Sequence, residues 1–132
     1  MKLISACLLG IKCEWDEKDR HKNDKAIKLL KNETLIPVCP EQLGGLKTPR
    51  PPQGIQGGTG ADVLDRKCEV INENGENVTR EFIRGAEETL KIANLFQIKE
   101  FIGKSNSPSC GYGKIYDTTG KLIDGDGVTT AL

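Results

Sequence analysis

Two kinds of hydrophobic pattern alternate along the chain. Short, nearly continuous apolar runs at 2–8, 35–39 and 98–103 predict buried strands. Between them, apolar residues recur every three or four positions at 24–30 and 79–96, which predicts two helices. Strands that alternate with helices favour a parallel sheet joined by right-handed crossovers. The pattern therefore predicts an α/β fold: a mostly parallel, Rossmann-like open sheet with flanking helices.

The remaining segments are polar or irregular. Residues 11–23 are predicted to form a loop, and 40–60 is rich in proline and glycine. An irregular stretch as long as 40–60 inside a compact domain is usually functional or mobile. We also expect Asp126 to cap a short final helix at 127–132.

Two short hairpins are predicted from turn residues. Asn72–Gly75 lies between the β-prone run 68–71 and Val78, and its Asn-Gly pair is a hairpin signal. A second turn, Thr118–Gly120, separates 114–117 from 121–123.

Length and charge narrow the class of protein. The 132 residues fit one domain with one core, so we expect a single domain over 1–132. Nineteen basic residues balance nineteen acidic ones, so no electrostatic footprint for duplex nucleic acid is expected. No apolar stretch approaches the roughly 18 residues of a membrane helix. The apolar run at the start is too short for a signal peptide, so a cytoplasmic location is expected.

Three of the five cysteines occupy matching positions. Cys7 lies near the end of the first predicted strand, Cys39 ends the second, and Cys110 follows the third. Ligands of an open parallel sheet bind beyond the carboxyl ends of its strands, where these thiols would converge. The plain alternative is that each cysteine is a small buried hydrophobe.

Metal chemistry is the main use of such a thiol set. Five cysteines in a reducing compartment favour metal binding, catalysis or packing over disulfides. Structural zinc usually takes four ligands, often in closely spaced pairs, and no Cys-x-x-Cys pair occurs here. The lone histidine, His21, lies in a polar loop and is interpreted as solvated. Three thiolates suit a 4Fe-4S cluster that leaves one iron open.

At these residues the chain resembles domain-of-unknown-function family 523, which is similar to the desulfidase domain of thiouracil desulfidase. The resemblance runs over essentially the whole chain and is strongest in the two cysteine-bearing loops. The segments that carry it are Ser5–Gly10, Pro37–Leu46, Thr48–Pro52, the helix start with Val78, Thr79, Phe82, Gly85 and Ala86, Lys104–Gly111, and Gly125–Thr129.

The resemblance implies a 4Fe-4S cluster held by Cys7, Cys39 and Cys110. It leaves Cys13 and Cys68 outside the ligand set, although Cys13 is near enough to Cys7 to act as a fourth ligand. The chain departs from the family in one place: related sequences tend to carry Arg-Tyr-Asp-Gly where this one has Glu14–Glu17. Substrate contacts from that loop are therefore open.

The leading hypothesis is hydrolytic desulfuration of a small thiolated compound such as a nucleobase. The open iron would polarise a thiocarbonyl group, and water would attack its carbon. Glu41 is the candidate general base, because it lies two residues from Cys39, and Ser105 is a second candidate catalytic residue. Arg50, Ser107 and Ser109 are predicted to bind substrate. For each of them a surface, cap or turn role is the alternative.

Two other functions fit the same residues. One is a non-catalytic cysteine module that holds a metal or redox centre. The other is a metal-free domain whose glycine- and proline-rich loops bind a small anionic molecule.

Overall fold

A three-stranded parallel sheet organises the protein. The computed structural model describes residues 1–132 except 17, 19 and 20, so Glu17 of the predicted first loop lies outside the described residues. Strands β1 (Lys2–Ser5), β2 (Leu35–Val38) and β5 (Phe101–Ile102) are arranged in the order β2-β1-β5, and both pairings are parallel. The α/β class and the parallel open sheet are confirmed.

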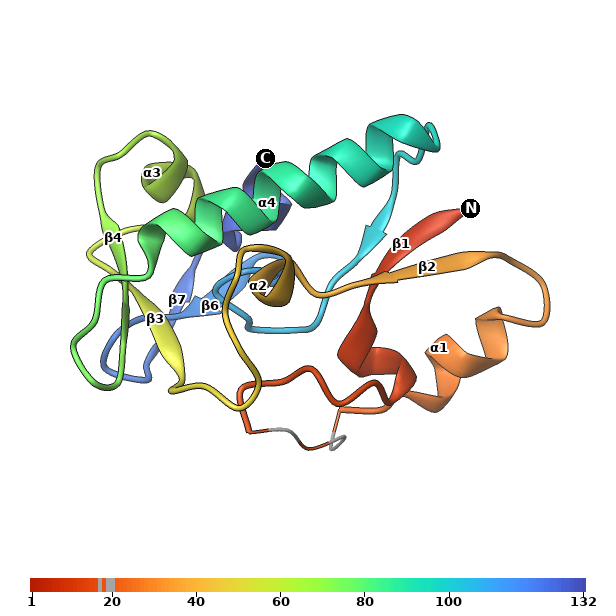
Figure 1. Ribbon diagram of the computed structural model, residues 1–132, viewed down its shortest axis with the longest axis horizontal. Coiled ribbons are helices and arrows are strands. Elements are labelled where there is room, and N and C mark those ends of the chain that lie inside the picture. The colour runs from red at the N-terminus through yellow and green to blue at the C-terminus, as the bar shows by residue number, and fades with distance from the viewer. Residues whose placement is uncertain (17, 19–20) are drawn as a thin grey trace.

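Helices cover both faces of this sheet (Figure 1). On one face, Ala26 of α1 (Asp24–Leu29) packs against Ile4 and a neighbouring strand residue, Leu35. On the other, α4 (Thr79–Leu95) contributes Ile92 and Ala93 to a cluster with Leu3, Val38 and Ile98. Leu3 and Ile4 point to opposite faces because side chains alternate along a strand.

The chain reverses its direction of travel across the sheet at β1. It passes from β1 outward to β2, and then crosses back to place β5 on the opposite side of β1. Such a reversal is the topological switch point of an open sheet, where ligands bind beyond the strand ends.

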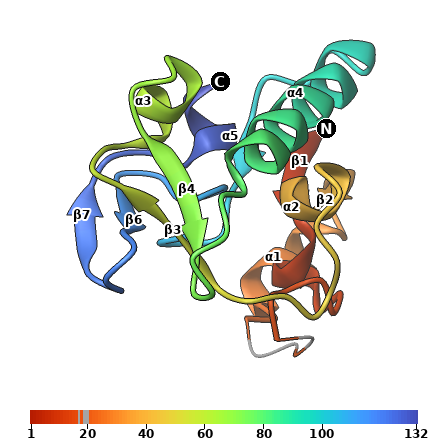
Figure 2. The ribbon, with the colours of Figure 1, turned by 60° about the vertical axis from the view of Figure 1, so that its left-hand side comes forward.

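The second half of the molecule is built from two antiparallel hairpin-like pairs (Figure 2). Strand β3 (Gln53–Gln56) pairs with β4 (Glu69–Asn72), and α3 (Gly60–Leu64) connects them. Strand β6 (Lys114–Tyr116) pairs with β7 (Leu122–Asp124), as the turn at 118–120 predicted. A short helix, α5 (Val128–Ala131), follows.

The largest core joins these pairs to the N-terminal half of α4. Its buried members are Ile55, Val63, Val70, Val78, Phe82, Ala86, Ile115 and Val128. Helix α4 therefore packs on both halves of the molecule, the hairpin core at its start and the parallel sheet toward its end. No helix in the described part of the chain has the length and apolarity needed to cross a membrane.

The buried face of α4 differs slightly from the predicted one. Phe82 and Ala86 are buried as expected, but Leu90 is 40% exposed. Thr89 takes the inward position instead, and its hydroxyl donates to the Gly85 carbonyl at 2.7 Å. Internal satisfaction of that hydroxyl makes a polar residue tolerable inside the helix contact.

Three predicted segments have different bounds. The first strand stops at Ser5, and the 3-10 helix η1 (Ala6–Leu9) follows it until Gly10 turns the chain with φ 85°. The third strand keeps only two of the residues predicted at 98–103. The irregular stretch 40–60 contains α2 (Pro40–Leu43) and β3.

One local prediction holds in part, and another was wrong. The run at 68–71 forms a strand whose main partner is β3. The chain does fold back at the Asn72–Gly75 turn, with the Ile71–Asn77 bridge and a 2.9 Å hydrogen bond from the Val78 N–H to the Val70 carbonyl, but it then enters α4. Asp126 does not cap the last helix, because Gly127 is the N-cap. The Asp126 carboxylate accepts the Gly113 N–H at 2.8 Å instead, which ties the two loops together.

Helices α2 and α4 approach with their backbones nearly touching. A Cβ atom placed on Gly85 would lie 1.9 Å from the Pro40 carbonyl oxygen, and one on Gly44 would lie 1.9 Å from the Glu81 oxygen. Both positions therefore require glycine. This contact fixes α2, whose N-cap is Cys39.

Candidate functional site

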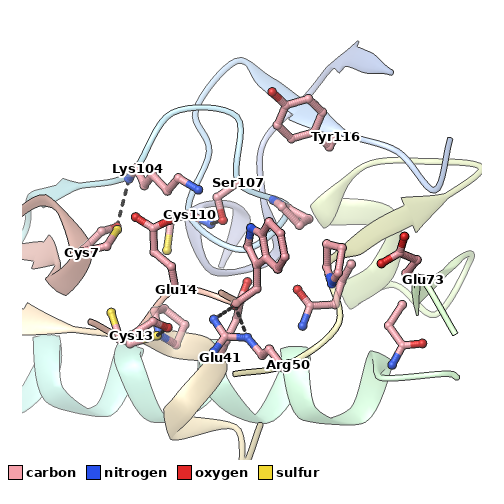
Figure 3. A pocket seen from close by; sticks show the side chains of 18 of the residues that line it. Cys7, Cys13, Glu14, Glu41, Arg50, Glu73, Lys104, Ser107, Cys110 and Tyr116 are labelled. Carbon is pink, nitrogen blue, oxygen red and sulfur yellow. Dashed lines mark hydrogen bonds and ion pairs between the residues drawn. The ribbon is translucent and has the colours of Figure 1, made fainter. Parts of the chain in front are cut away.

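A cavity of about 430 Å³ opens at the carboxyl ends of the parallel strands. Its walls come from η1, the loop that follows it, α2, the segment before β3, the β5–β6 loop and the turn between β6 and β7. The residues that line it and enter the argument below are Cys7, Cys13, Glu14, Cys39, Glu41, Arg50, Asn72, Glu73, Lys104, Ser107, Cys110 and Tyr116. Figure 3 shows this site.

The three predicted cysteines meet in this cavity. Cys7 lies in η1 just after β1, Cys39 is the N-cap of α2 just after β2, and Cys110 lies in the loop after β5. Cys7 and Cys110 are buried, whereas Cys39 is partly exposed. All five cysteines fall within the described residues, and all are free thiols.

The other two cysteines lie in different places. Cys13 lines the same cavity and packs with Cys7 and Cys39. Cys68 packs against the hairpin core and donates to the Thr59 carbonyl at 3.7 Å, away from the cavity. Cys68 therefore lies apart from the cysteines of the cavity, whereas Cys13 lies among them.

Local sequence explains how these thiols are aimed. Pro40 at the first position of α2 favours helix initiation just after Cys39. In the third loop, Ser107 Oγ accepts the N–H groups of Ser109 and Cys110, both at 3.1 Å. Ser107 therefore shapes the turn that presents Cys110.

Three thiols of this cavity, those of Cys13, Cys39 and Cys110, have raised pKa values. Burial raises the pKa of Cys110 to about 12. A hydrogen bond with Cys39 lowers the pKa of Cys13, but a hydrogen bond with Cys7 and burial outweigh it and raise the value to about 11. The hydrogen bond with Cys13, followed by burial, raises the pKa of Cys39 far above its usual range. Thiolate ligation at this site would therefore release protons.

The described residues contain no preformed site for a single metal ion: no group of three or more His, Cys, Asp and Glu side chains lies close enough to hold one. Cys7, Cys39 and Cys110 instead come from three separate segments that line one cavity. Soft thiolates of this kind are the donors that a polynuclear cluster takes.

A buried ion pair joins two of the predicted site residues. Glu41 Oε2 accepts from Arg50 Nε at 2.8 Å and also from Nη2. Arg50 Nη1 donates to the Thr48 hydroxyl at 3.0 Å and to the Lys47 carbonyl at 3.3 Å. With its donors engaged, Arg50 serves to orient Glu41, and it is less suited to hold the anionic substrate group predicted from the sequence.

The predicted serines occupy different environments. Ser107 lines the cavity. Ser109 is buried outside it, where its hydroxyl shares a 3.1 Å hydrogen bond with that of Thr129. Ser105 is exposed and does not line the cavity. Roles for Ser105 and Ser109 in chemistry or substrate contact therefore gain no support from their placement.

Sequence reasoning missed one buried acid. Glu14 lies in the loop predicted at 11–23, yet its side chain is only 3% exposed. Glu14 Oε1 accepts from His21 Nδ1 at 2.5 Å, so His21 is not merely solvated. A glutamate in a polar stretch carries no periodic signal of burial. The loop is drawn inward by contacts distant in sequence, including a 2.7 Å bond from the Arg50 N–H to the Trp15 carbonyl.

Comparisons with known proteins agree with this architecture. The family model described as 2-thiouracil desulfurase matches residues 3–132. The uncharacterized protein YbbK of Bacillus subtilis (strain 168) is 44% identical over 134 residues, which cover 100% of this chain and 88% of YbbK. Among solved structures, the 4Fe-4S-dependent thiouracil desulfidase TudS (DUF523Vcz) is 38% identical and superposes with a TM-score of 0.84. That match covers 98% of this chain and 82% of TudS. The chain therefore belongs to the 2-thiouracil desulfurase family.

Proposed function

We propose that this protein is a desulfidase that holds a 4Fe-4S cluster on Cys7, Cys39 and Cys110 and removes sulfur from a small thiolated compound, with a thiolated nucleobase as the best candidate. The observation that carries the proposal is the presence of these three thiols around one cavity, each from the end of a different parallel strand. The similar structure TudS is named as a 4Fe-4S-dependent thiouracil desulfidase. The proposal places the protein in a reducing, cytoplasmic compartment, where its thiols stay free.

The residues present fit such a cluster. Thiolates are the usual ligands of iron–sulfur centres, and the three cysteines reach one cavity from three separate segments. The described residues contain no preformed single-ion site that would compete with a cluster. When bound, the cluster would supply an iron that acts as a Lewis acid toward the thiocarbonyl sulfur.

The cavity has the size and character of a small-molecule site. Ligand pockets are commonly about 300–1,000 Å³, mostly apolar, with a few placed polar groups. At about 430 Å³ this one suits a single heterocycle. The overall reaction would exchange one oxygen for one sulfur: water supplies the oxygen, and the sulfur leaves as hydrogen sulfide.

Glu41 is the candidate base for the water. Arg50 holds one carboxylate oxygen, Oε2, and thereby sets the orientation of the other. Oε1 accepts no hydrogen bond from the described residues, so it is available to a water in the cavity. A base needs to lie within hydrogen-bond reach of the proton it takes, and the Arg50 clamp supplies that positioning.

Ser107 is the candidate for orienting the substrate. Its oxygen already accepts two backbone N–H groups, so its own proton is the part left to donate. Ser107 lies three residues before Cys110 and lines the cavity. The Ser107 hydroxyl could hold an acceptor atom of the ligand near the three cysteines.

Anaerobic reconstitution tests the proposal. Wild-type protein should take up about four irons and release hydrogen sulfide and uracil from 2-thiouracil. Single Cys7→Ser, Cys39→Ser and Cys110→Ser variants should lose most of the iron, whereas Cys68→Ser should retain it. Iron uptake near zero in the wild type, or equal uptake in all four variants, would refute the cluster assignment.

One observation favours a second candidate function. Cys13 stands beside Cys7 and Cys39 in the same cavity, so four thiols are available. Four thiolates would close every coordination position and give a non-catalytic metal or redox module. Cys13→Ser separates the two: it should leave iron uptake and turnover intact in a three-cysteine enzyme and should destroy the metal centre of a four-cysteine module.

A further inference from the structure

The cavity contains a buried acceptor that the proposed chemistry does not use. Glu14 Oε2 is fully shielded from solvent and has no hydrogen-bond partner among the residues that the structure describes. The side chain as a whole is 3% exposed. An unpaired buried carboxylate oxygen is costly, because it has lost water and gained nothing in return.

A hydrogen-bond donor for Glu14 Oε2 can come from a ligand in the cavity. His21 occupies the other oxygen, Oε1, and its own side chain is 40% exposed. Figure 3 shows the Glu14 carboxylate pointing toward Cys7 and Cys110, in the same part of the cavity as Lys104. Among the described residues, Glu14 pairs with His21 and not with Lys104.

The chemistry of this oxygen restricts what can satisfy it. A carboxylate accepts hydrogen bonds and donates none. A ligand that fills the cavity must therefore present a donor near the thiol end. Thiolated nucleobases carry such donors, because the ring N–H groups flank the carbon that bears the sulfur.

We propose that Glu14 is a specificity-determining residue that accepts a ring N–H adjacent to the thiocarbonyl carbon, so that the enzyme selects substrates with a free N–H beside the C=S group. The inference rests on the proposed desulfidase function. His21 is a positioning residue, since its hydrogen bond to Oε1 fixes which carboxylate oxygen faces the ligand.

N-Methylated ligands provide the test. Wild-type protein, anaerobically reconstituted, is compared on 2-thiouracil and its 1-methyl, 3-methyl and 1,3-dimethyl derivatives. Binding of uracil and the same methylated uracils, which cannot lose sulfur, is measured in parallel by calorimetry. Removing the N–H that Glu14 accepts should weaken binding and kcat/KM by roughly 10- to 100-fold, because the buried oxygen is left unpaired.

Glu14→Gln is the decisive variant. If His21 continues to donate to the amide oxygen, the amide NH2 group faces the cavity, so a donor replaces an acceptor. The preference for the N–H ligand should then disappear or reverse. Glu87→Gln is the matched control, because Glu87 is exposed on α4 and does not line the cavity, and it should keep the wild-type preference. Thermal melts and iron content of each variant check that fold and cluster are intact.

The outcomes separate this inference from the function it rests on. Turnover with an unchanged N–H preference in Glu14→Gln overturns the inference and leaves the function standing, since the preference would then be steric. Glu14-dependent N–H preference in uracil binding without turnover supports the inference and refutes the function. Loss of iron in Glu14→Gln, or no binding of uracil or thiouracil by the wild type, overturns the inference.

Discussion

Replacing Gly85 by alanine is expected to weaken the fold and the site together. In an exposed helix interior, glycine to alanine stabilises by about 1 kcal/mol. Here the added Cβ would lie 1.9 Å from the Pro40 carbonyl oxygen, and real contacts of this kind do not fall below 3.0 Å. The backbones of α2 and α4 would have to separate by roughly 1 Å. Overpacking costs about 1–3 kcal/mol, and a clash with backbone, which cannot rotate aside, belongs to the upper part of that range, about 2–3 kcal/mol. After the gain of about 1 kcal/mol in helix propensity, the net loss should be roughly 1–2 kcal/mol.

Urea unfolding followed by circular dichroism measures this loss. With a slope of about 2 kcal/mol per molar urea, the middle of the usual range, the midpoint should fall by roughly 0.5–1 M. Arg84→Ala is the control, since Arg84 is the adjacent residue of α4 and is exposed; it should change stability by less than about 0.5 kcal/mol.

The same variant should impair the site, because Cys39 caps α2 and Glu41 lies in its first turn. Iron uptake and sulfide release should both fall in Gly85→Ala and stay unchanged in Arg84→Ala. A Gly85→Ala protein as stable as the wild type or more stable would show that helix propensity prevails. The close contact between α2 and α4 would then not be what fixes the position of Cys39.

Three further perturbations bear on separate parts of the molecule. Arg50→Met should lower the free energy of unfolding by roughly 3–5 kcal/mol, because it leaves Glu41 unpaired, and the double variant Arg50→Met/Glu41→Met should recover much of that loss. Lys114→Met, which breaks the exposed pair with Asp124, should cost less than about 1 kcal/mol. Equal losses in Arg50→Met and Lys114→Met would contradict the role of burial. Hydrogen bonds from the Thr59 N–H and hydroxyl lower the pKa of Asp62 in the folded protein. The stability that Asp62 contributes is therefore present above its usual pKa of 3.8 and lost as pH falls through the lower folded pKa. Urea midpoints of Asp62→Asn should decline less steeply in acid than those of the wild type, and parallel declines would count against the capping interaction. Cluster assembly should release protons, which a pH indicator in weakly buffered solution would record, and it should proceed better as pH rises toward the raised pKa of Cys110. Reconstitution without proton release would argue that other atoms bind the iron.

The sequence predicted those features that depend on local pattern and chain order. Alternating strand and helix signals identified the parallel sheet, and the positions of Cys7, Cys39 and Cys110 at strand ends placed three thiols at one edge. The hairpin at 114–123 followed from its turn residues.

Features set by contacts distant in sequence could not be predicted in the same way. Glu14 is polar and lies in a polar loop, so its burial depends on how that loop folds back over the cavity. Arg50 looked free to bind an anion until the fold placed Glu41 beside it. Likewise, the hairpin suggested by Asn72–Gly75 is only a short one, and the main partner of β4 is β3, because strand pairing depends on tertiary context as well as on turn chemistry.

The order of the strands has a consequence for how the protein is made. The last strand of the sheet in chain order is β5, and Cys110 lies eight residues after Ile102, where β5 ends. A nascent chain that ends before β5 carries Cys7 and Cys39 but lacks the third wall of the cavity. Iron delivery during synthesis would therefore meet an incomplete ligand set, and maturation of the site must wait until α4 has crossed the sheet and the last strand has docked.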